Sequence, residues 1–251
     1  MKLINDELEF IRTVLKVANT VNIGNIIIEP GKVRAMDDDQ TIVLFQDTNV
    51  PNMSFGSIGL NRINVFDSRL ELARSQDNFN VEAVVTGIDN EIGFDIYDPT
   101  TKNPAPMWVR SLLMSGKGTK IDYRCASPQT IKAPKKRAGV IQYRIDINAD
   151  MVNMIQKGSN AMKADELTFN GGVDGVGLSI TDINGDSLEY HFTDVVHLES
   201  TGDVSDFSYK YSIKTVLPIF KLIPTGSFFI TTRGSLVMSL HGLDIYIMAR
   251  A

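Results

Sequence analysis

The sequence predicts an α+β fold in which a helix followed by antiparallel strands occurs twice in one chain. Residues 4–45 and residues 147–192 follow the same plan, an Ile-Asn pair, a helical stretch and then a strand-rich run that ends at a phenylalanine. Each helical stretch places basic residues on one side. A length of 251 residues is enough for two domains of ordinary size. The repeat therefore favours two similar domains over one large one.

The charge balance limits the kinds of partner that the chain can bind. Its formal net charge is −5, whereas nucleic-acid-binding domains are usually basic. An acidic exterior with basic residues confined to one face would still attract a polyanion to that face and suppress adhesion elsewhere. Two copies of a helix-plus-sheet unit with basic helices suggest a ring or half-ring around a polyanion, and DNA fits that description.

Composition also indicates the compartment. Hydrophobic residues make up 43% of the chain, which is typical of a globular protein. No apolar run approaches the roughly 20 residues that span a bilayer, and the N-terminal MKLINDELEF carries acids where a signal peptide needs an apolar core. We therefore expect a soluble, intracellular protein. The single cysteine, Cys125, excludes an internal disulfide and is expected to be a small buried residue.

The first helix is predicted to run to Thr20. Asn5 can cap it, and the two acids that follow suit its first turn. Strands are predicted at 25–36, around a Pro-Gly turn, and at 41–45. At helical spacing, the apolar side holds Leu8, Ile11, Val14, Leu15 and Ala18, and the opposite side holds Arg12, Lys16 and Asn19.

A second helix is predicted over residues 60–73. Arg62 and Arg69 lie seven positions apart, which places them on one helix face. The acids Asp67 and Glu71 lie near that basic face. Strand-like runs follow at 80–85, 92–97, 108–114 and 120–125, and the segment 79–110 holds an extra hairpin-length insertion.

Residues 126–139 are predicted to link the two halves. The segment contains two prolines, a basic triplet at 135–137 and little periodicity. A basic triplet can form a localisation signal or a nucleic-acid patch. In this context we interpret it as a solvated linker.

The second half opens with a predicted strand at 140–147 and a helix that Asn148 caps. No acid is expected on the polar side of this helix, although solvated helices usually mix both signs. The apolar side holds Met151, Met154, Ile155, Ala161 and Met162, and the polar side holds Asn153, Gln156, Lys157, Asn160 and Lys163.

The remainder of the second half is predicted to be mostly strand. A short helix fits residues 216–223, where Pro218 is tolerated because it falls in the first turn. The predicted strands are 166–170, 175–181, 187–192, 227–232, 235–240 and 244–249.

Three glycine-containing segments resemble ligand-binding loops but lack their requirements. The glycines at 171–177 precede a strand, whereas a dinucleotide fingerprint opens a helix. The segment 182–187 lacks the glycine and glutamate that a calcium loop needs. In 115–119 a glycine separates lysine from threonine, unlike a phosphate loop. We interpret all three as turns. No catalytic or metal-binding spacing is present either. Catalytic carboxylates need no local signature, so this absence favours, without requiring, a protein that has no enzyme activity, metal or cofactor.

The order of elements resembles that of DNA sliding clamps, the processivity factors of DNA polymerases. The resemblance rests on two basic helices at matching positions and on the proline-containing connector. The end SIKTVLPIFKLIPTGSFFITTRGSLVMSLHGLDIYIMARA resembles the C-terminal part of a two-domain clamp. The run KIDYRCASPQTIKAPKK resembles the last strand and connector of the T-even phage type, and the chain is also similar to proliferating cell nuclear antigen.

The resemblance implies two similar clamp domains, each with antiparallel sheets outside and two helices inside, that assemble as a ring. The domains would be 1–125 and 141–251, joined by a connector at 126–140. Three chains would form a six-domain homotrimer. The implied partners are double-stranded DNA of any sequence, a polymerase tail peptide and a clamp loader, with no membrane. The compartment would be the host cytoplasm if the protein is phage-encoded.

The resemblance also implies roles for particular residues. The strand near Thr119–Cys125 would pair with the strand near Ser187–Thr193 of the next chain. A partner peptide would bind between Ile131 and Pro134 of the connector and either Tyr246 or Ile247, because side chains alternate along a strand. The DNA-facing residues would be Arg12, Lys16, Arg62, Arg69, Lys157, Lys163 and Lys221, with Lys214 a weaker candidate because it precedes the predicted helix.

Two other classes of protein remain open at this stage. A viral or phage structural protein built from β-sandwich domains would have the same strand content, but it does not explain basic residues at matched helical positions. A small-molecule enzyme with dispersed carboxylates would show a deep pocket with perturbed carboxylates. Oligomeric state separates these classes from a clamp, which should be a closed homotrimer or a monomer–trimer equilibrium.

Overall fold

The computed structural model describes residues 2–3, 5–51, 53, 55–86, 107–134, 139–172, 175–198, 206–223 and 225–250. The chain divides into two units. Unit 1 comprises Met1–Asp38 and Leu44–Lys135, and unit 2 comprises Asp39–Val43 and Lys136–Ala251. The division between Lys135 and Lys136 falls within the segment that the sequence suggests as a connector.

Three of the first four strands match their predictions to within one residue, whereas the fourth, Ile58–Asn61, is not predicted. The Pro-Gly turn between β1 and β2 forms as expected, with Gly31 at a positive φ of 73° that suits glycine. β4 pairs antiparallel with the other side of β1, and β3 follows β2 in the strand order. The strands are β1 (Asn25–Glu29), β2 (Lys32–Met36), β3 (Ile42–Gln46) and β4 (Ile58–Asn61).

A second, three-stranded antiparallel sheet completes unit 1. Its order is β5 (Asn80–Thr86), β6 (Trp108–Gly116) and β7 (Thr119–Arg124). The segment 115–119 is the turn of the β6–β7 hairpin, with Gly118 at φ 78°, and not a phosphate loop. The strand expected at 92–97 lies outside the described residues.

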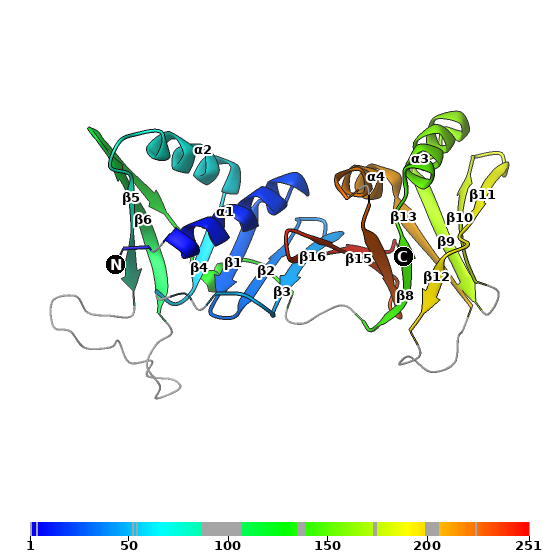
Figure 1. Ribbon diagram of the computed structural model, residues 1–251, viewed down its shortest axis with the longest axis horizontal. Helices are drawn as coiled ribbons and strands as arrows, with labels where there is room; N and C mark the ends of the chain where they lie inside the picture. Colours follow the sequence, from blue (N-terminus) through cyan, green and yellow to red (C-terminus); the bar gives the residue numbers. More distant parts are fainter. Residues whose placement is uncertain are drawn as a thin grey trace. The chain divides into compact units, whose positions relative to one another are not determined.

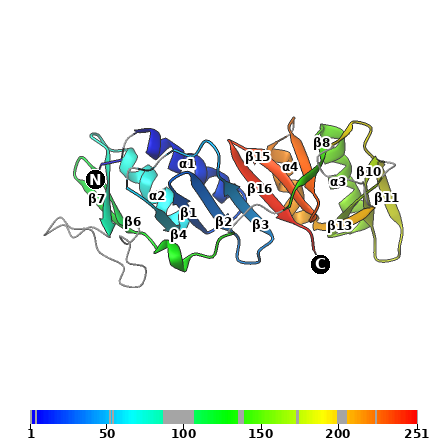
Figure 2. The same ribbon diagram turned by 90° about the horizontal axis from the view of Figure 1, so that it is seen from below.

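The two helices of unit 1 pack beside each other on the strands (Figures 1 and 2). α1 (Asn5–Thr20) buries its apolar side as predicted, although Leu8 is only half-buried. The helix begins at Asn5 itself, so Asn5 does not occupy the predicted capping position.

α2 (Ile63–Arg74) begins three residues later than the sequence predicts. Leu60 and Asn61 belong to β4 because they pair with Ile26 and Asn25 of β1. Strand pairing therefore overrides the local helical pattern. Arg62 precedes the helix in a left-handed conformation, with φ 51° and ψ 52°.

Unit 2 contains two antiparallel sheets. One has the order β12-β8-β14-β15-β16 and the other β11-β10-β9-β13. The strands β12 and β13 were not predicted. The bounds are β8 (Ile141–Asp146), β9 (Glu166–Gly172), β10 (Gly175–Thr181), β11 (Ser187–His191), β12 (Val195–His197), β13 (Phe207–Ser212), β14 (Ser227–Thr231), β15 (Ser235–Leu240) and β16 (Leu243–Met248).

The other two glycine-containing segments also lie at hairpins. β9 and β10 pair up to Gly172 and Gly175, so the segment 171–177 joins two strands. At the tip of the next hairpin, the Asp182 carboxylate accepts backbone hydrogen bonds from Asn184 at 2.8 Å and Asp186 at 2.9 Å. This local bonding is an Asx turn, which explains the segment without calcium.

The helix α3 (Ala149–Met162) has the predicted cap. The Asn148 side chain accepts a 2.8 Å hydrogen bond from the backbone N–H of Met151. The apolar side differs from the prediction. Ala161 is exposed and Met154 and Met162 are only half-buried, while Val152 and Gly158 are buried.

The helix α4 (Ile213–Leu222) begins three residues earlier than predicted. The backbone N–H of Ile213 donates to the carbonyl of Asp165 at 2.9 Å, and this bond holds the start of the helix. Pro218 is therefore the sixth helical residue and not part of the first turn, so it leaves the carbonyl of Lys214 without its usual helical donor.

The core of unit 2 is rich in aromatic rings. Phe228 packs against Phe169 and Phe220, with ring centroids 5.3 and 5.1 Å apart. α3 and α4 lie next to each other over this core (Figure 1). Among the described residues, no helix is long and apolar enough to cross a membrane.

Candidate nucleic-acid interface

A groove of about 480 Å³ lies between α1 and α2 in unit 1. Two of its lining residues, Arg12 and Lys16, are predicted DNA-facing residues. The groove also holds three acids, Glu9, Asp67 and Glu71. The helices of unit 1 therefore do not present the uniformly basic side that the sequence suggests.

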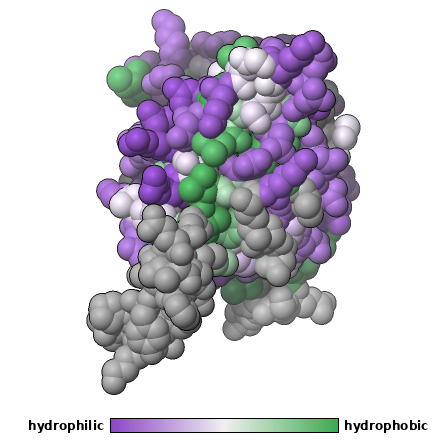
Figure 3. All heavy atoms as spheres, turned by 90° about the vertical axis from the view of Figure 1, so that its left-hand side faces the viewer, coloured by the Kyte–Doolittle hydropathy of each residue, from purple (hydrophilic) through white to green (hydrophobic). Residues whose placement is uncertain are grey.

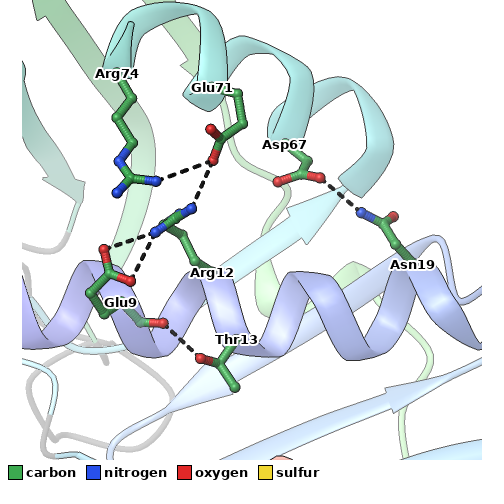
Figure 4. Close-up of polar contacts among 7 residues, drawn as sticks. All are labelled: Glu9, Arg12, Thr13, Asn19, Asp67, Glu71 and Arg74. Atoms are coloured by element: carbon green, nitrogen blue, oxygen red, sulfur yellow. Dashed lines mark hydrogen bonds and ion pairs between the residues drawn. The ribbon is translucent and has the colours of Figure 1, made fainter. Parts of the chain in front are cut away.

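The guanidinium of Arg12 is held by carboxylates from both helices (Figure 4). Its Nη1 lies 2.9 and 2.8 Å from the two carboxylate oxygens of Glu9, one turn earlier on α1. Its Nη2 donates to Glu71 of α2 at 3.1 Å. Partial burial alone would lower the pKa of Arg12, but the two carboxylates outweigh burial and raise the pKa. Arg12 thus ties the two helices together.

Asp67 forms the second link between the helices. Its carboxylate accepts a 3.1 Å hydrogen bond from the amide of Asn19 (Figure 4). Desolvation and the nearby charge of Glu71 raise the pKa of Asp67, and they outweigh the opposing effects of Arg12 and Asn19. The acids Asp67 and Glu71 therefore face α1, one helical turn apart.

The arginines Arg62 and Arg69 lie on another side of unit 1. Asp67 and Glu71 project from α2 towards α1, and Arg69 lies about 180° around the helix from them at 100° per residue. Both arginines are close enough to Tyr123 of β7 to oppose the increase in its pKa to about 12, which desolvation of the hydroxyl causes. Because Arg62 is not part of the helix, the predicted shared helix face is wrong.

In unit 2, α3 exposes the polar side that the sequence predicts. All five residues of that side are exposed. Lys163 is the left-handed C-cap and not a helical residue, with φ 48°. Asp150 is also exposed and lies seven residues before Lys157, on the same side of the helix. The prediction of an acid-free side therefore fails at the first turn of α3.

The helix α4 has the most clearly basic exposed face. It contains Lys214 and Lys221, seven residues apart and both exposed, and its sequence holds no acid. Lys214 belongs to the helix, contrary to the prediction, and its Nζ lies 2.9 Å from the carboxylate of Asp165. This pair is highly exposed, with side-chain exposures of 80% and 72%, so it is weak.

A groove of about 580 Å³ lies between α3 and α4. Lys163 and Lys214 line it, together with one acid, Asp165. Its neutral polar lining residues are Ser159 and Asn160. The two helix grooves therefore differ in charge, because acids outnumber bases in unit 1 and bases outnumber acids in unit 2.

The connector residues Ile131 and Pro134 are half-buried against unit 1. The carbonyl of Pro134 accepts a 3.3 Å hydrogen bond from Arg34 of β2, which also pairs with Glu29 of β1 at 2.8 Å. A short 3₁₀ helix, Pro128–Thr130, precedes Ile131. The basic triplet 135–137 lies outside the described residues.

The other two predicted partner-binding residues are not accessible. Tyr246 and Ile247 of β16 are 4% and 1% exposed. The expected alternation fails because both faces of β16 are covered at this position, and Val237, the cross-strand partner of Tyr246, is also buried.

The strands predicted to join neighbouring chains end their sheets. β7 is the last strand in the order β5-β6-β7, and β11 is the first in the order β11-β10-β9-β13. On the face of unit 1 in Figure 3, an apolar strip runs between hydrophilic side chains. Half-exposed apolar residues on the β5-β6-β7 sheet of unit 1 include Val85, Leu113 and Ile121.

Comparison with known proteins gives matches in structure but not in sequence. The sequence matches no protein-family model, and no relative is found among curated protein sequences. Proliferating cell nuclear antigen from Entamoeba histolytica matches with a TM-score of 0.55 at 11% identity, over 95% of each chain. The chain has the sliding-clamp fold.

Two further solved structures show the same fold. In one, PCNA from A. fulgidus is bound to the C-terminal region of FEN-1, and it matches 97% of this chain and 96% of its own with a TM-score of 0.54 at 14% identity. The other is the beta sliding clamp of C. crescentus, which matches all of this chain and 65% of its own with a TM-score of 0.58 at 11% identity. The predicted α+β clamp fold is thereby confirmed.

Proposed function

We propose that this chain is a DNA sliding clamp, a processivity factor that encircles duplex DNA and tethers the replicative polymerase. The observation that carries the proposal is the clamp fold, which extends over 95% or more of the chain in each match. The proposed mechanism is topological and needs no catalytic group. A closed ring cannot dissociate sideways from DNA, so a weakly held polymerase stays at the primer end.

The proposed assembly is a head-to-tail homotrimer of two-domain chains, with domains 1–125 and 141–251. Repeated heterologous contacts close into a ring when the rotation between subunits is right. β7 of one chain would pair with β11 of the next, which would cover two sheet ends that otherwise invite aggregation. The exposed charged residues of β7 are Lys120, Asp122 and Arg124, whose net positive charge is opposite to that of Glu189 of β11 and favours this pairing.

The proposed DNA contacts lie mainly on unit 2. Lys157, Lys163 and Lys221 are exposed, and Lys214 shares a helix face with Lys221. A lysine contacts phosphate as a point charge and not in bidentate geometry. Such contacts do not fix the protein at one register along the DNA, as sliding requires. Lys16 is the best candidate on unit 1 because it is exposed and, within the described part of the chain, forms no ion pair. Arg62 and Arg69 remain weaker proposals.

A peptide partner is also proposed, because the A. fulgidus clamp binds the C-terminal region of FEN-1. The polymerase tail peptide would contact the connector at Ile131 and Pro134, since half-buried apolar residues there retain exposed surface. Ile131→Ala should weaken binding of the peptide without changing the mass of the ring. Calorimetry decides this, since equal affinity for variant and parent would remove Ile131 from the site.

The finer attributes of the proposal rest on the sequence resemblance. They are the T-even phage type, opening of the ring by an ATP-driven loader, and an intracellular location, which is the host cytoplasm for a phage protein. None of them is needed for the tests below.

The decisive experiment combines charge-reversal substitutions with a measurement of the mass of the native assembly. A variant with Lys157→Glu, Lys163→Glu and Lys221→Glu should lose most of its binding to duplex DNA at low salt. Its native assembly should contain the same number of chains as that of the parent. The matched control is Lys210→Glu, an exposed lysine on β13 of the same unit. Because phosphate contacts release counterions, the affinity of the parent should fall steeply with salt. Unchanged DNA binding in the triple variant would refute the assignment.

A further inference from the structure

The two helix grooves differ in a way that the two-domain repeat does not require. In unit 1, the basic residue closest to both helices, Arg12, is held by two carboxylates. In unit 2, the two lysines that line the α3–α4 groove, Lys163 and Lys214, are exposed, and of these only Lys214 has an acidic partner among the described residues. A difference in charge of this kind matters for a protein that must hold DNA weakly enough to slide.

The geometry leaves Arg12 little capacity to bind a phosphate. Its Nη1 contacts both oxygens of Glu9, and its Nη2 contacts Glu71. A phosphate would have to replace these charge-assisted hydrogen bonds, because both terminal nitrogens are already engaged. The Arg12 side chain is also only 25% exposed, whereas its partners Glu9 and Glu71 are 61% and 51% exposed. The acids therefore face solvent more than the base that they neutralise.

The same carboxylates would repel an approaching phosphate. Glu9 and Lys16 are seven residues apart on the exposed side of α1, so a phosphate drawn to Lys16 meets the charge of Glu9. Glu71 and Asp67 add negative charge on the α2 side of the groove. Seven residues rise about 10 Å along a helix, which is close to the Debye length of about 8–10 Å at physiological salt, so screening weakens this repulsion there and leaves most of it at low salt.

We propose that Glu9 and Glu71 mask Arg12 and weaken the attraction of the α1–α2 surface for DNA, so that DNA is held mainly by the α3–α4 surface. The inference rests on the proposed clamp function and adds a tuning role to two acids. Under this proposal, Arg12 positions the helices and does not contact DNA. Removal of the acids should therefore strengthen DNA binding.

The test compares Glu9→Gln and Glu71→Gln with the parent in binding to a short duplex by fluorescence anisotropy at about 50 mM salt. Both acids are exposed, so the variants should fold, and glutamine keeps the side-chain size. Each variant should bind about threefold more tightly, which is the effect of removing one unit charge about 7 Å away in water-like surroundings. The matched control, Asp77→Asn, removes an exposed acid that does not line the groove and should bind as the parent does.

A second readout separates masking from a general change in net charge. In the double variant, the freed Arg12 gains one phosphate contact, so the slope of log affinity against log salt should steepen by about 0.9. Glu71 also lies 3.8 Å from Arg74, so the two arginines must be separated. Adding Arg12→Gln to the double variant should restore the parental slope, whereas adding Arg74→Gln in its place should not. Parental affinity and slope in the double variant would overturn the proposal.

The outcome also distinguishes this inference from the proposed function. If the lysine variants of unit 2 weaken DNA binding while both glutamine variants bind as the parent does, only the masking proposal is wrong. If the parent and every variant fail to bind DNA, the clamp proposal fails and the masking proposal fails with it.

Discussion

The side chain of Ile131 lies directly against Gly59 of β4. A Cβ atom added at Gly59 would lie 3.1 Å from Cδ1 of Ile131 and 2.4 Å from the carbonyl oxygen of Ala126. The backbone N–H of Ala126 also donates to the carbonyl of Gly59 at 2.9 Å. The connector therefore begins alongside β4, where Ala126 forms an antiparallel bridge with Gly59, and only glycine leaves room for it.

The first prediction is that Gly59→Ala displaces the start of the connector. The 2.4 Å contact is with backbone, so a rotamer change cannot relieve it. Unit 1 should lose about 1–3 kcal/mol of its free energy of unfolding, as in other overpacked sites. Urea unfolding measures this. Gly24→Ala is the control, because no atom lies within 4 Å of its added Cβ. Equal urea midpoints for the two variants would contradict the close packing of the connector against Gly59.

A second prediction concerns Asp146 at the end of β8. The Ser227 hydroxyl donates a 2.6 Å hydrogen bond to its carboxylate, and this bond, helped by Arg144, lowers the pKa of Asp146 below 3.8. A lowered pKa in the folded state stabilises the fold above the pKa of the unfolded chain. That stability is lost as the pH falls through the folded pKa.

Ser227→Ala should therefore raise the pKa of Asp146 towards its ordinary value. The stability difference between variant and parent should be present at neutral pH and should shrink below about pH 4. NMR titration of the Asp146 carboxyl and unfolding at two pH values measure both effects. An unchanged titration would show that the hydrogen bond does not form in solution.

The third prediction is that Cys125 is unreactive. Cys125 is half-buried and not fully buried as the sequence predicts. Desolvation of the thiol, with a smaller effect from Asp122, nevertheless raises the pKa of Cys125 to about 12. The thiolate is the reactive form, so alkylation at pH 8 should be on the order of 100- to 1,000-fold slower than for the unfolded chain. Mass spectrometry after iodoacetamide treatment in the presence and absence of urea tests it. Similar rates in both conditions would contradict the burial of this thiol.

The fourth prediction concerns Pro218 inside α4. Pro218→Ala supplies the missing N–H for the carbonyl of Lys214, so it should stabilise unit 2 by about 1 kcal/mol. Pro30→Ala is the control, because Pro30 lies in a turn that favours proline and should gain nothing. Thermal unfolding compares the two. A loss of stability in Pro218→Ala would mean that the ring of Pro218 makes a contact that outweighs the hydrogen bond.

The features predicted correctly from sequence depend on short-range patterns. The buried side of α1, the Asn148 cap and the three glycine turns all follow from residues within a few positions of one another. The overall repeat was visible for the same reason, because helix and strand periodicities recur in the same order.

The features that were missed depend on distant residues. The start of α2 is set by the pairing of β4 with β1, and the start of α4 by a hydrogen bond to Asp165. The ion pairs of Arg12 include Glu71, which lies 59 positions away in sequence. Helix faces alone do not show this pairing, and the place of Arg12 among the DNA contacts stays a prediction.

The central claim is that the protein encircles DNA, and retention on linear DNA tests it most directly. The protein is loaded at about 50 mM salt onto duplexes with open ends, both ends are then blocked with a bulky bound protein, and the salt is raised to weaken ionic contacts. A sliding ring should remain bound until one end is cut and should then leave. Release at the same rate from blocked and open DNA would contradict the account.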